Sequence, residues 1–283
     1  EIISADSMQV YRGMDIGSAK ITEEEMQGIP HELIDIADPS EEWNVVRFQR
    51  EAKAAVQRIT AKGRLPVLVG GTGFYIQALL YDIDFTETRE DTSYRSLLEE
   101  KARTEGNESL YRMLLEKDPE AAAAIHPNNL KRVIRALEFT RETGEKISDH
   151  NEEQRKRLPA YDAVFFVLTM EREKLYRRID LRVDQMMEAG LLEEVKRLQE
   201  QGFTSRDVSM QGLGYKQILQ YLEGEGTLED AVEQIKLQTR HFAKRQLTWF
   251  RRERDVIWVN TDEFPSREEM LDYMENTIRT RFS

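Results

Sequence analysis

The stretch Leu65-Pro-Val-Leu-Val-Gly-Gly-Thr-Gly-Phe-Tyr-Ile-Gln-Ala-Leu-Leu80 decides the fold class of this 283-residue chain. Its first five residues form a continuous apolar run, which is typical of a parallel strand covered on both faces. Gly70, Gly71 and Gly73 then permit a tight turn, and Phe74–Leu80 reads as a helix. A buried strand, a glycine turn and a helix in that order predict a doubly wound α/β sheet.

Two further strand signals lie upstream of this stretch. Ile2-Ile3 reads as a short buried strand, and His31–Ile36 reads as a second strand followed by the turn Asp38-Pro39-Ser40. Asn44 is a favourable helix cap. The helix that we expect after it has apolar residues at helical spacing, namely Val45, Phe48, Ala52, Ala55 and Ile59.

The middle of the chain, from about residue 85 to about residue 158, has helical periodicity and no convincing strand. Asp118-Pro119 predicts a helix start with a cap and a first-turn proline. Asn129 predicts the cap of another helix over Leu130–Thr143, which Gly144 ends.

Strand signals return after this helical region. Tyr161–Thr169 predicts a strand that rejoins the sheet, and Asp255–Asn260 predicts a late strand in a mostly helical final third. We therefore predict a catalytic α/β core made of residues 1–86 and 159–283, with residues 87–158 as a helical insertion domain.

The composition excludes several classes of protein. The chain is 40% hydrophobic and 33% charged, and no apolar run approaches the roughly 20 residues that a membrane-spanning helix needs. It has no cysteine, which excludes disulfides and thiolate catalysis and fits a reducing cytoplasm. Its four histidines lack metal-ligand spacing. We expect a cytoplasmic monomer that holds no metal ion by its own side chains.

The position of Asp6 makes it a candidate catalytic residue. It follows the predicted strand Ile2-Ile3 within a polar turn. Ligands of open α/β sheets bind beyond the carboxyl ends of the strands, where a carboxylate can accept a proton or orient a substrate amine. The alternative is that Asp6 merely caps the turn, and the sequence leaves both roles open.

The glycine turn Gly70–Gly73 is a second candidate site. Its glycines permit close approach of a ligand to the backbone, and the following helix presents free N–H groups. Thr72 adds a hydroxyl that can bond a phosphate or a nucleotide. The alternative, a tight turn between strand and helix without a ligand, is the more frequent use of such a sequence.

Two basic segments stand out against a net charge of −12. In Leu130–Glu138, Lys131 and Arg135 lie one helical turn apart, so they suit successive phosphates of a nucleic-acid strand. In Arg240–Arg252, cations alternate with aromatic residues that can stack on bases. The second segment places Arg245, Trp249 and Arg252 on one face, and the first buries Val133, Ile134 and Leu137. The alternative for both segments is a solvated helix face.

Several of these segments, in the same order, resemble conserved blocks of the tRNA dimethylallyltransferases, also called tRNA isopentenyltransferases. The opening block contains Asp6-Ser7-Met8-Gln9, and Val69-Gly70-Gly71-Thr72 matches the next one. Ile125-His126-Pro127-Asn128 and the basic helix after it resemble the insertion-domain contact segment of the family. Gly214-Tyr215-Lys216 and Ala243–Arg251 complete the set.

The resemblance implies a P-loop nucleotide-kinase-like core that transfers a dimethylallyl group from dimethylallyl diphosphate. The acceptor would be the exocyclic N6 amine of the adenosine immediately 3′ of the anticodon, so the RNA partner would be the tRNA anticodon stem-loop. Mg²⁺ would assist by holding the diphosphate.

The resemblance also implies roles for individual residues. Asp6, as general base, Thr72 and Arg95 would be catalytic, and Arg95 and Lys216 are candidates to neutralise the leaving diphosphate. The residues expected to contact tRNA are Asp6, Ser7, Met8, Gln9, Lys131, Arg132, Val133, Ile134, Arg135, Tyr215, Lys216, Lys244 and Arg245.

One motif of the family has no match in these 283 residues, the phosphate loop G-x-x-x-x-G-K-[ST]. We expect the natural chain to carry that loop, and the strand before it, upstream of Glu1. Three alternative functions stay open: an adenylate isopentenyltransferase that uses a free nucleotide, a P-loop small-molecule kinase, and a non-catalytic RNA-binding module.

Overall fold

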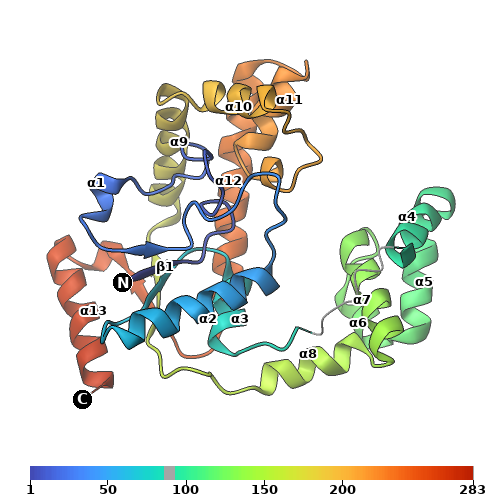
Figure 1. Cartoon of the computed structure of the whole chain (residues 1–283), viewed down its shortest axis with the longest axis horizontal. Helices are drawn as coiled ribbons and strands as arrows, with labels where there is room; N and C mark the ends of the chain where they lie inside the picture. The colour runs from blue at the N-terminus through green and yellow to red at the C-terminus, as the bar shows by residue number, and fades with distance from the viewer. Residues whose placement is uncertain (86–92, 283) are drawn as a thin grey trace. The chain divides into compact units, whose positions relative to one another are not determined.

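The computed structural model describes residues 1–85 and 93–282 (Figure 1). It divides into two compact units: unit 1 comprises Glu1–Leu80 and Tyr161–Ser283, and unit 2 comprises Tyr81–Ala160. The predicted boundary between residues 86 and 87 lies outside the described residues. The predicted return to the core at residue 159 lies two residues before Tyr161, where unit 1 resumes. No helix of the described ranges is long and apolar enough to cross a bilayer.

Every strand pairing of the described residues in unit 1 is parallel, as the sequence predicts. The expected cover on both faces of the strand at Val67–Val69 is wrong, because Val67 and Val69 are 40% and 52% exposed. β1 (Ile2–Ser4) is the central strand of a three-stranded sheet, between β2 (His31–Glu32) and β3 (Val67–Val69). The register pairs Ile3 of β1 with Leu68 of β3. β4 (Phe165–Thr169) and β5 (Val256–Asn260) pair with each other in a second sheet.

The strand predicted over His31–Ile36 is wrong beyond its first two residues. Leu33 and Asp35 have φ angles of 66° and 55°, in the left-handed region, which a strand cannot accommodate. The chain therefore leaves the sheet after Glu32. The strand predicted over Tyr161–Thr169 begins only at Phe165, and it pairs with β5 in the second sheet, so the prediction that it rejoins the first sheet is wrong.

Helices make up most of unit 1 (Figure 1). Asn44 caps α2 as predicted, because its Oδ1 accepts a hydrogen bond of 3.0 Å from the Arg47 N–H. The long helix α12 packs against α3, α9 and α11. The helices are α1 (Glu23–Met26), α2 (Val45–Ala61), α3 (Gly73–Leu80), α9 (Arg172–Glu188), α10 (Leu191–Glu200), α11 (Tyr215–Leu222), α12 (Leu228–Phe250) and α13 (Arg267–Arg281), with 3₁₀ turns at Ser209–Gln211 and Thr261–Glu263.

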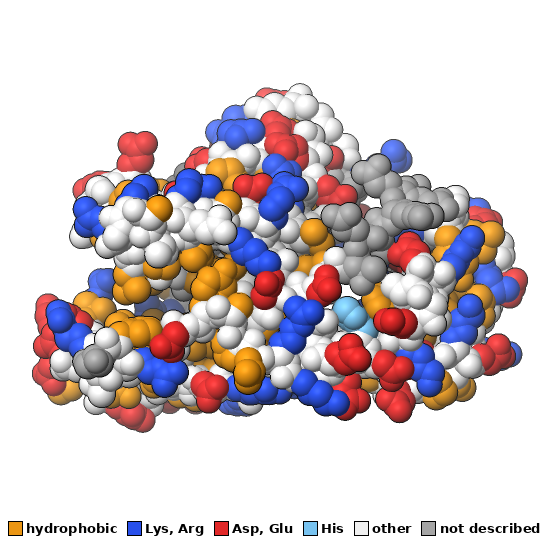
Figure 2. Space-filling model, turned by 60° about the horizontal axis from the view of Figure 1, so that its bottom comes forward, with side chains coloured by type: hydrophobic (Ala, Val, Ile, Leu, Met, Phe, Trp, Pro, Cys, Tyr) orange, Lys and Arg blue, Asp and Glu red, His pale blue; other side chains and the backbone are white. Residues whose placement is uncertain are grey.

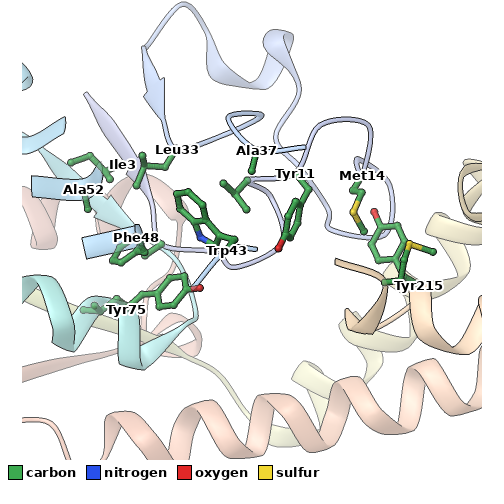
Figure 3. Packing of buried hydrophobic residues seen from close by; sticks show 14 of the residues in the cluster. Ile3, Tyr11, Met14, Leu33, Ala37, Trp43, Phe48, Ala52, Tyr75 and Tyr215 are labelled. Carbon is green, nitrogen blue, oxygen red and sulfur yellow. The ribbon is translucent and has the colours of Figure 1, made fainter. Parts of the chain in front are cut away.

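The core of unit 1 lies where α2 and α3 pack beside β1, and it continues into the loop after β1 (Figure 3). Phe48 of α2 stacks on Tyr75 of α3 with ring centroids 4.4 Å apart. Tyr11, Trp43 and Ile3 are buried in the same cluster. This packing fixes the loop that follows β1, which carries the candidate base.

The regular elements of unit 2 are all helices among its described residues. Asp118 caps α6 by accepting 2.9 Å from the Ala121 N–H, and Gly144 ends α7 in the left-handed conformation. Asn129 precedes α7, but its side chain makes no capping hydrogen bond, so that part of the prediction is wrong. The helices are α4 (Ser93–Glu105), α5 (Asn107–Lys117), α6 (Pro119–Ala124), α7 (Leu130–Thr143) and α8 (Ile147–Lys156).

Candidate active site and RNA-facing surfaces

Asp6 lies just beyond the carboxyl end of β1, and its side chain caps the turn, which is one of the two roles that the sequence left open. Its Oδ1 accepts 2.7 Å from the Met8 N–H and 3.2 Å from the Gln9 N–H, so it caps its own turn. Its Oδ2 has no hydrogen bond to any described residue. Burial raises the pKa of the Asp6 carboxyl, and the two backbone hydrogen bonds oppose that shift. One oxygen therefore holds the turn while the other can accept a proton.

Thr72 lies beside Asp6 because the ends of β1 and β3 are bonded to each other. The Ala5 N–H donates to the Val69 carbonyl over 2.7 Å, and the Thr72 N–H donates to the Ala5 carbonyl over 3.3 Å. A Cβ added at Gly70 would lie 2.5 Å from the Ala5 carbonyl carbon, so this approach requires glycine. The Thr72 hydroxyl makes no hydrogen bond to a described residue and can serve a substrate.

Helix α12 supports the glycine turn from the other side. Gln246 Nε2 donates to the Gly71 carbonyl over 2.9 Å, and a Cβ at Gly73 would lie 2.3 Å from Trp249 Cδ1. Trp249 also meets the Phe74 ring edge-to-face, with centroids 6.1 Å apart. Trp249, considered above for base stacking, therefore packs on the turn. The glycines admit protein atoms, in agreement with the structural alternative for this motif.

An adjoining surface of α12 carries the two cations expected to contact tRNA. Lys244 and Arg245 are exposed and form no ion pair with any described residue. They line a concave surface with His241, Thr248, Trp249 and Arg252. Elsewhere acidic and basic side chains are interspersed, as the face in Figure 2 shows. The net charge of −12 therefore coexists with local groups of free cations.

The segment around Tyr215 lies against the loop that carries Asp6. A Cβ at Gly212 would lie 2.4 Å from Met8 Cε, so the two segments touch. The Tyr215 side chain is fully buried, and its hydroxyl donates to Glu194 Oε1 over 2.7 Å. Burial and the adjacent Glu194 carboxylate raise the pKa of Tyr215. Lys216 is exposed and has no ion pair within the described part of the chain.

The other residues of the opening block differ in their exposure and in their internal hydrogen bonds. Gln9 is committed to internal hydrogen bonds: its Nε2 donates to the Ala19 carbonyl over 3.2 Å, and its Oε1 accepts from Ser4 Oγ over 3.3 Å. Ser7 and Met8 are partly exposed. The structure therefore gathers Asp6, Ser7, Met8 and Thr72 in unit 1, with Gln9 behind them.

Sequence reasoning missed Glu194, the residue that holds the loop after this block. Its carboxylate is 3% exposed and accepts hydrogen bonds from three successive backbone N–H groups, those of Asp15, Ile16 and Gly17, at 3.1, 2.9 and 3.1 Å. The signal was available in α10. Glu194 shares the apolar face of Leu191, Val195 and Leu198, and a charge on a buried face needs partners.

In unit 2, α7 presents three cations on a helix whose opposite side is buried. Lys131 and Arg132 are exposed, Arg135 is partly exposed, and none of these residues, named here the α7 cations, has an ion pair to a described residue. Val133 and Ile134 are 0% and 3% exposed and pack in the core of unit 2, as the helical pattern predicts. The side chains of Val133 and Ile134 do not reach the surface in this conformation. By packing in the core they fix the face of α7 on which the α7 cations are exposed.

Arg95 belongs to unit 2 and is already paired. Its Nε donates 2.9 Å to Glu138 Oε1 and its Nη2 donates 2.6 Å to Glu138 Oε2, a two-pronged ion pair between α4 and α7. Half of the Arg95 side chain is exposed, whereas Glu138 is nearly buried. Any anion that Arg95 binds must therefore share the guanidinium with Glu138.

The chain is similar to known proteins over nearly its whole length. The profile of the IPP transferase family matches residues 9–253. The chain is 59% identical over 274 residues to the tRNA dimethylallyltransferase of Lachnoclostridium phytofermentans, which covers 97% of this chain and 88% of that one. It is 50% identical over 280 residues to the tRNA dimethylallyltransferase of Acetivibrio thermocellus, with 99% and 90% covered.

Solved structures show the same likeness. The tRNA isopentenylpyrophosphate transferase of Bacillus halodurans superimposes with a TM-score of 0.73 at 46% identity, and 99% of this chain and 88% of that chain are covered. A eukaryotic dimethylallyltransferase acting on tRNA superimposes with a TM-score of 0.83 at 32% identity, with 99% and 73% covered.

Proposed function

Because the chain belongs to the IPP transferase family, we propose that it transfers a dimethylallyl group from dimethylallyl diphosphate to tRNA. The acceptor is the N6 amine of the adenosine immediately 3′ of the anticodon. The observation that carries the proposal is that Asp6 and Thr72 each keep an oxygen without a hydrogen bond to a described residue, the Asp6 Oδ2 and the Thr72 hydroxyl. They stand at the adjoining ends of two parallel strands, where such sheets bind ligands.

The reaction needs a base, because an adenine amine is a poor nucleophile. As N6 attacks the first carbon of the dimethylallyl group, a C–N bond forms and the C–O bond to the diphosphate breaks. N6 loses one proton, which Asp6 Oδ2 accepts, and the electron pair of the broken bond leaves on the diphosphate. A carboxylate whose pKa is raised by burial is a better proton acceptor than an ordinary aspartate. Thr72 orients the acceptor through its hydroxyl.

The diphosphate leaves with negative charge that cations must neutralise. Lys216 is exposed and unpaired among the described residues, and Arg95 can contribute through the part of its guanidinium that Glu138 leaves exposed. Among the described residues no group of three or more His, Asp or Glu side chains could hold a metal ion. Mg²⁺ would supply charge neutralisation while bound to the diphosphate and water, its common coordination in phosphate sites.

The RNA partner is the tRNA anticodon stem-loop, with the α7 cations in unit 2 and Lys244 and Arg245 in unit 1 as phosphate contacts. Unpaired surface cations can release counterions from a nucleic acid at little cost, because they have no internal ion pair to break. These cations favour tRNA over a free adenine nucleotide as acceptor. We expect the protein to act as a cytoplasmic monomer.

The test is mass spectrometry of nucleosides from tRNA incubated with the full-length protein, dimethylallyl diphosphate and Mg²⁺. We expect one added dimethylallyl group on the adenosine immediately 3′ of the anticodon. Parallel reactions offer adenosine monophosphate as acceptor, and ATP with an unmodified tRNA. Prenylation of the free nucleotide with none on tRNA, or phosphate transfer from ATP, would replace the proposal with one of the alternatives.

A further inference from the structure

We propose that Glu194 is a positioning residue for tRNA binding, because it holds the loop Tyr11–Lys20 in the conformation that supports Gln9 and Met8. The inference rests on the proposed function, since it assigns a role in the recognition of that same substrate. Glu194 lies on α10, far along the chain from the loop, and touches none of the groups proposed to react.

The bonds at Glu194 form a complete set. Oε2 accepts from the N–H groups of Asp15 and Ile16, and Oε1 accepts from the Gly17 N–H and the Tyr215 hydroxyl. Four donors on one buried carboxylate make charge-assisted hydrogen bonds, which are about twice as strong as neutral ones. A neutral amide at this position would turn its own N–H₂ toward an N–H or O–H donor, so it cannot restore the set.

The Tyr215 ring packs on the loop at Gly17, the residue whose N–H group donates to Glu194. A Cβ at Gly17 would lie 2.5 Å from Tyr215 Cζ, so the Tyr215 ring covers the loop backbone where Glu194 bonds it. Met14, one loop residue earlier than Asp15, is fully buried in the same core cluster as Tyr215 (Figure 3). The loop is thus held by the Glu194 carboxylate, by the Tyr215 ring and by the buried side chain of Met14.

The loop in turn supports the residues expected to contact tRNA. Gln9 donates to the Ala19 carbonyl, so the far end of the loop braces the opening block. Lys20 Nζ donates 2.7 Å to the Tyr11 carbonyl and pairs with the carboxylates of Asp15 and Asp35, which closes the loop on itself. Loss of the anchor at Asp15–Gly17 frees the middle of the loop, while its end stays tied to Gln9 through Ala19 and to Asp35 through Lys20, so the support that Gln9 receives from the loop becomes weaker.

The chemistry should be spared, because neither Glu194 nor the loop amides that it holds make a hydrogen bond to Asp6 or Thr72. Both hydrogen bonds to Asp6 Oδ1 come from Met8 and Gln9 within the turn itself. Without Glu194, only a fraction of the molecules have the loop in the conformation that binds tRNA. The apparent affinity for tRNA is the intrinsic affinity multiplied by that fraction. Saturating tRNA selects the competent loop, so kcat is retained. A fall to about one tenth raises the KM for tRNA about tenfold.

The experiment compares Glu194→Gln with Glu193→Gln in the full-length enzyme. Glu193 is the neighbouring residue on α10, and its carboxylate pairs with Lys196 at the surface, so it is a matched control. For Glu194→Gln we expect a rise of about tenfold in the KM for tRNA, a kcat within about twofold and an unchanged KM for dimethylallyl diphosphate. Hydrogen exchange should show faster exchange at the amides of Asp15, Ile16 and Gly17, with β1 unchanged. The control should match the wild type throughout.

Two outcomes would overturn the inference. One is an unchanged KM for tRNA in a folded Glu194→Gln enzyme, and the other is a fall in kcat alone, which a reduced folded fraction produces. If that variant does not fold, Tyr215→Phe retains the ring over Gly17 and removes one donor, and a KM rise of about threefold is expected. Failure of the proposed function is a separate result: the wild type itself would transfer nothing to tRNA.

Discussion

Asp6→Asn separates the two roles of the Asp6 side chain. The asparagine carbonyl oxygen can take the place of Oδ1 and accept from the Met8 and Gln9 N–H groups, whereas its N–H₂ cannot accept a proton. The variant should therefore fold normally and bind tRNA within a few-fold of the wild type. Loss of a general base costs about 10²–10⁴-fold in rate. That range corresponds to about 2.7–5.4 kcal/mol in the activation barrier.

Asp6→Ala is the companion variant, because it removes the base and the cap together. Each of the two lost backbone hydrogen bonds is worth about 0.5–1.5 kcal/mol, so the free energy of unfolding should fall by about 1–3 kcal/mol. Its rate should fall at least as far as that of Asp6→Asn, and its tRNA affinity should also fall, because the freed turn carries Met8 and Gln9.

Single-turnover kinetics with saturating enzyme measure the transfer step, and chemical denaturation measures stability. The reasoning predicts a large rate loss in both variants and a stability loss in Asp6→Ala alone. If Asp6→Asn transfers within tenfold of the wild type, Asp6 is not the base. A stability loss in Asp6→Asn equal to that of Asp6→Ala would show that the asparagine does not restore the cap.

Three further predictions concern the protonation of Asp6, the α7 cations and the glycine turn. A base works when it is deprotonated, so kcat/KM should fall as the pH falls through a pKa above the ordinary aspartate value of about 3.9, and an acidic limb at or below that value would contradict the burial of Asp6. Replacing the α7 cations with alanine should weaken tRNA binding and reduce the slope of log K against log salt by about 0.7–0.9 for each lost phosphate contact. An unchanged slope would assign α7 to a solvated face. Gln246→Met removes the donor to the Gly71 carbonyl, so the single-turnover rate should fall about tenfold while tRNA affinity is kept, and equal rates would show that the turn holds itself.

Local features of the fold could be predicted from the sequence because neighbouring residues determine them. The Asn44 cap and the burial of Val133 and Ile134 follow from spacing within one helix. The strand predicted over His31–Ile36 is too long, because the sequence pattern does not reveal the left-handed backbone at Leu33 and Asp35.

The parts of the candidate site that the sequence did not reveal depend on contacts between distant segments. Asp6 was placed correctly at a strand end, and its use as a turn cap was one of the two roles considered. Glu194 accepts a hydrogen bond from Ile16, which lies 178 residues earlier in the chain, and Gln246 of α12 donates to Gly71, which lies 175 residues earlier. Neither partner can be predicted from the spacing of neighbouring residues. Tyr215 and Arg95 were considered for substrate contact, and the structure adds that each has a carboxylate partner.

The glycine at position 70 also limits how this protein can vary. Its Cα passes so close to the Ala5 carbonyl that any side chain there would overlap the backbone just after β1. A shift of β3 by two residues, which keeps its side chains on the same faces, would bring Thr72 to that point and its side chain into the carbonyl. The steric limit at Gly70 therefore favours the observed alignment of the two strands, which puts Asp6 beside Thr72. Insertions or deletions between Val69 and Gly73 should be rare among functional variants, even where the rest of unit 1 tolerates them.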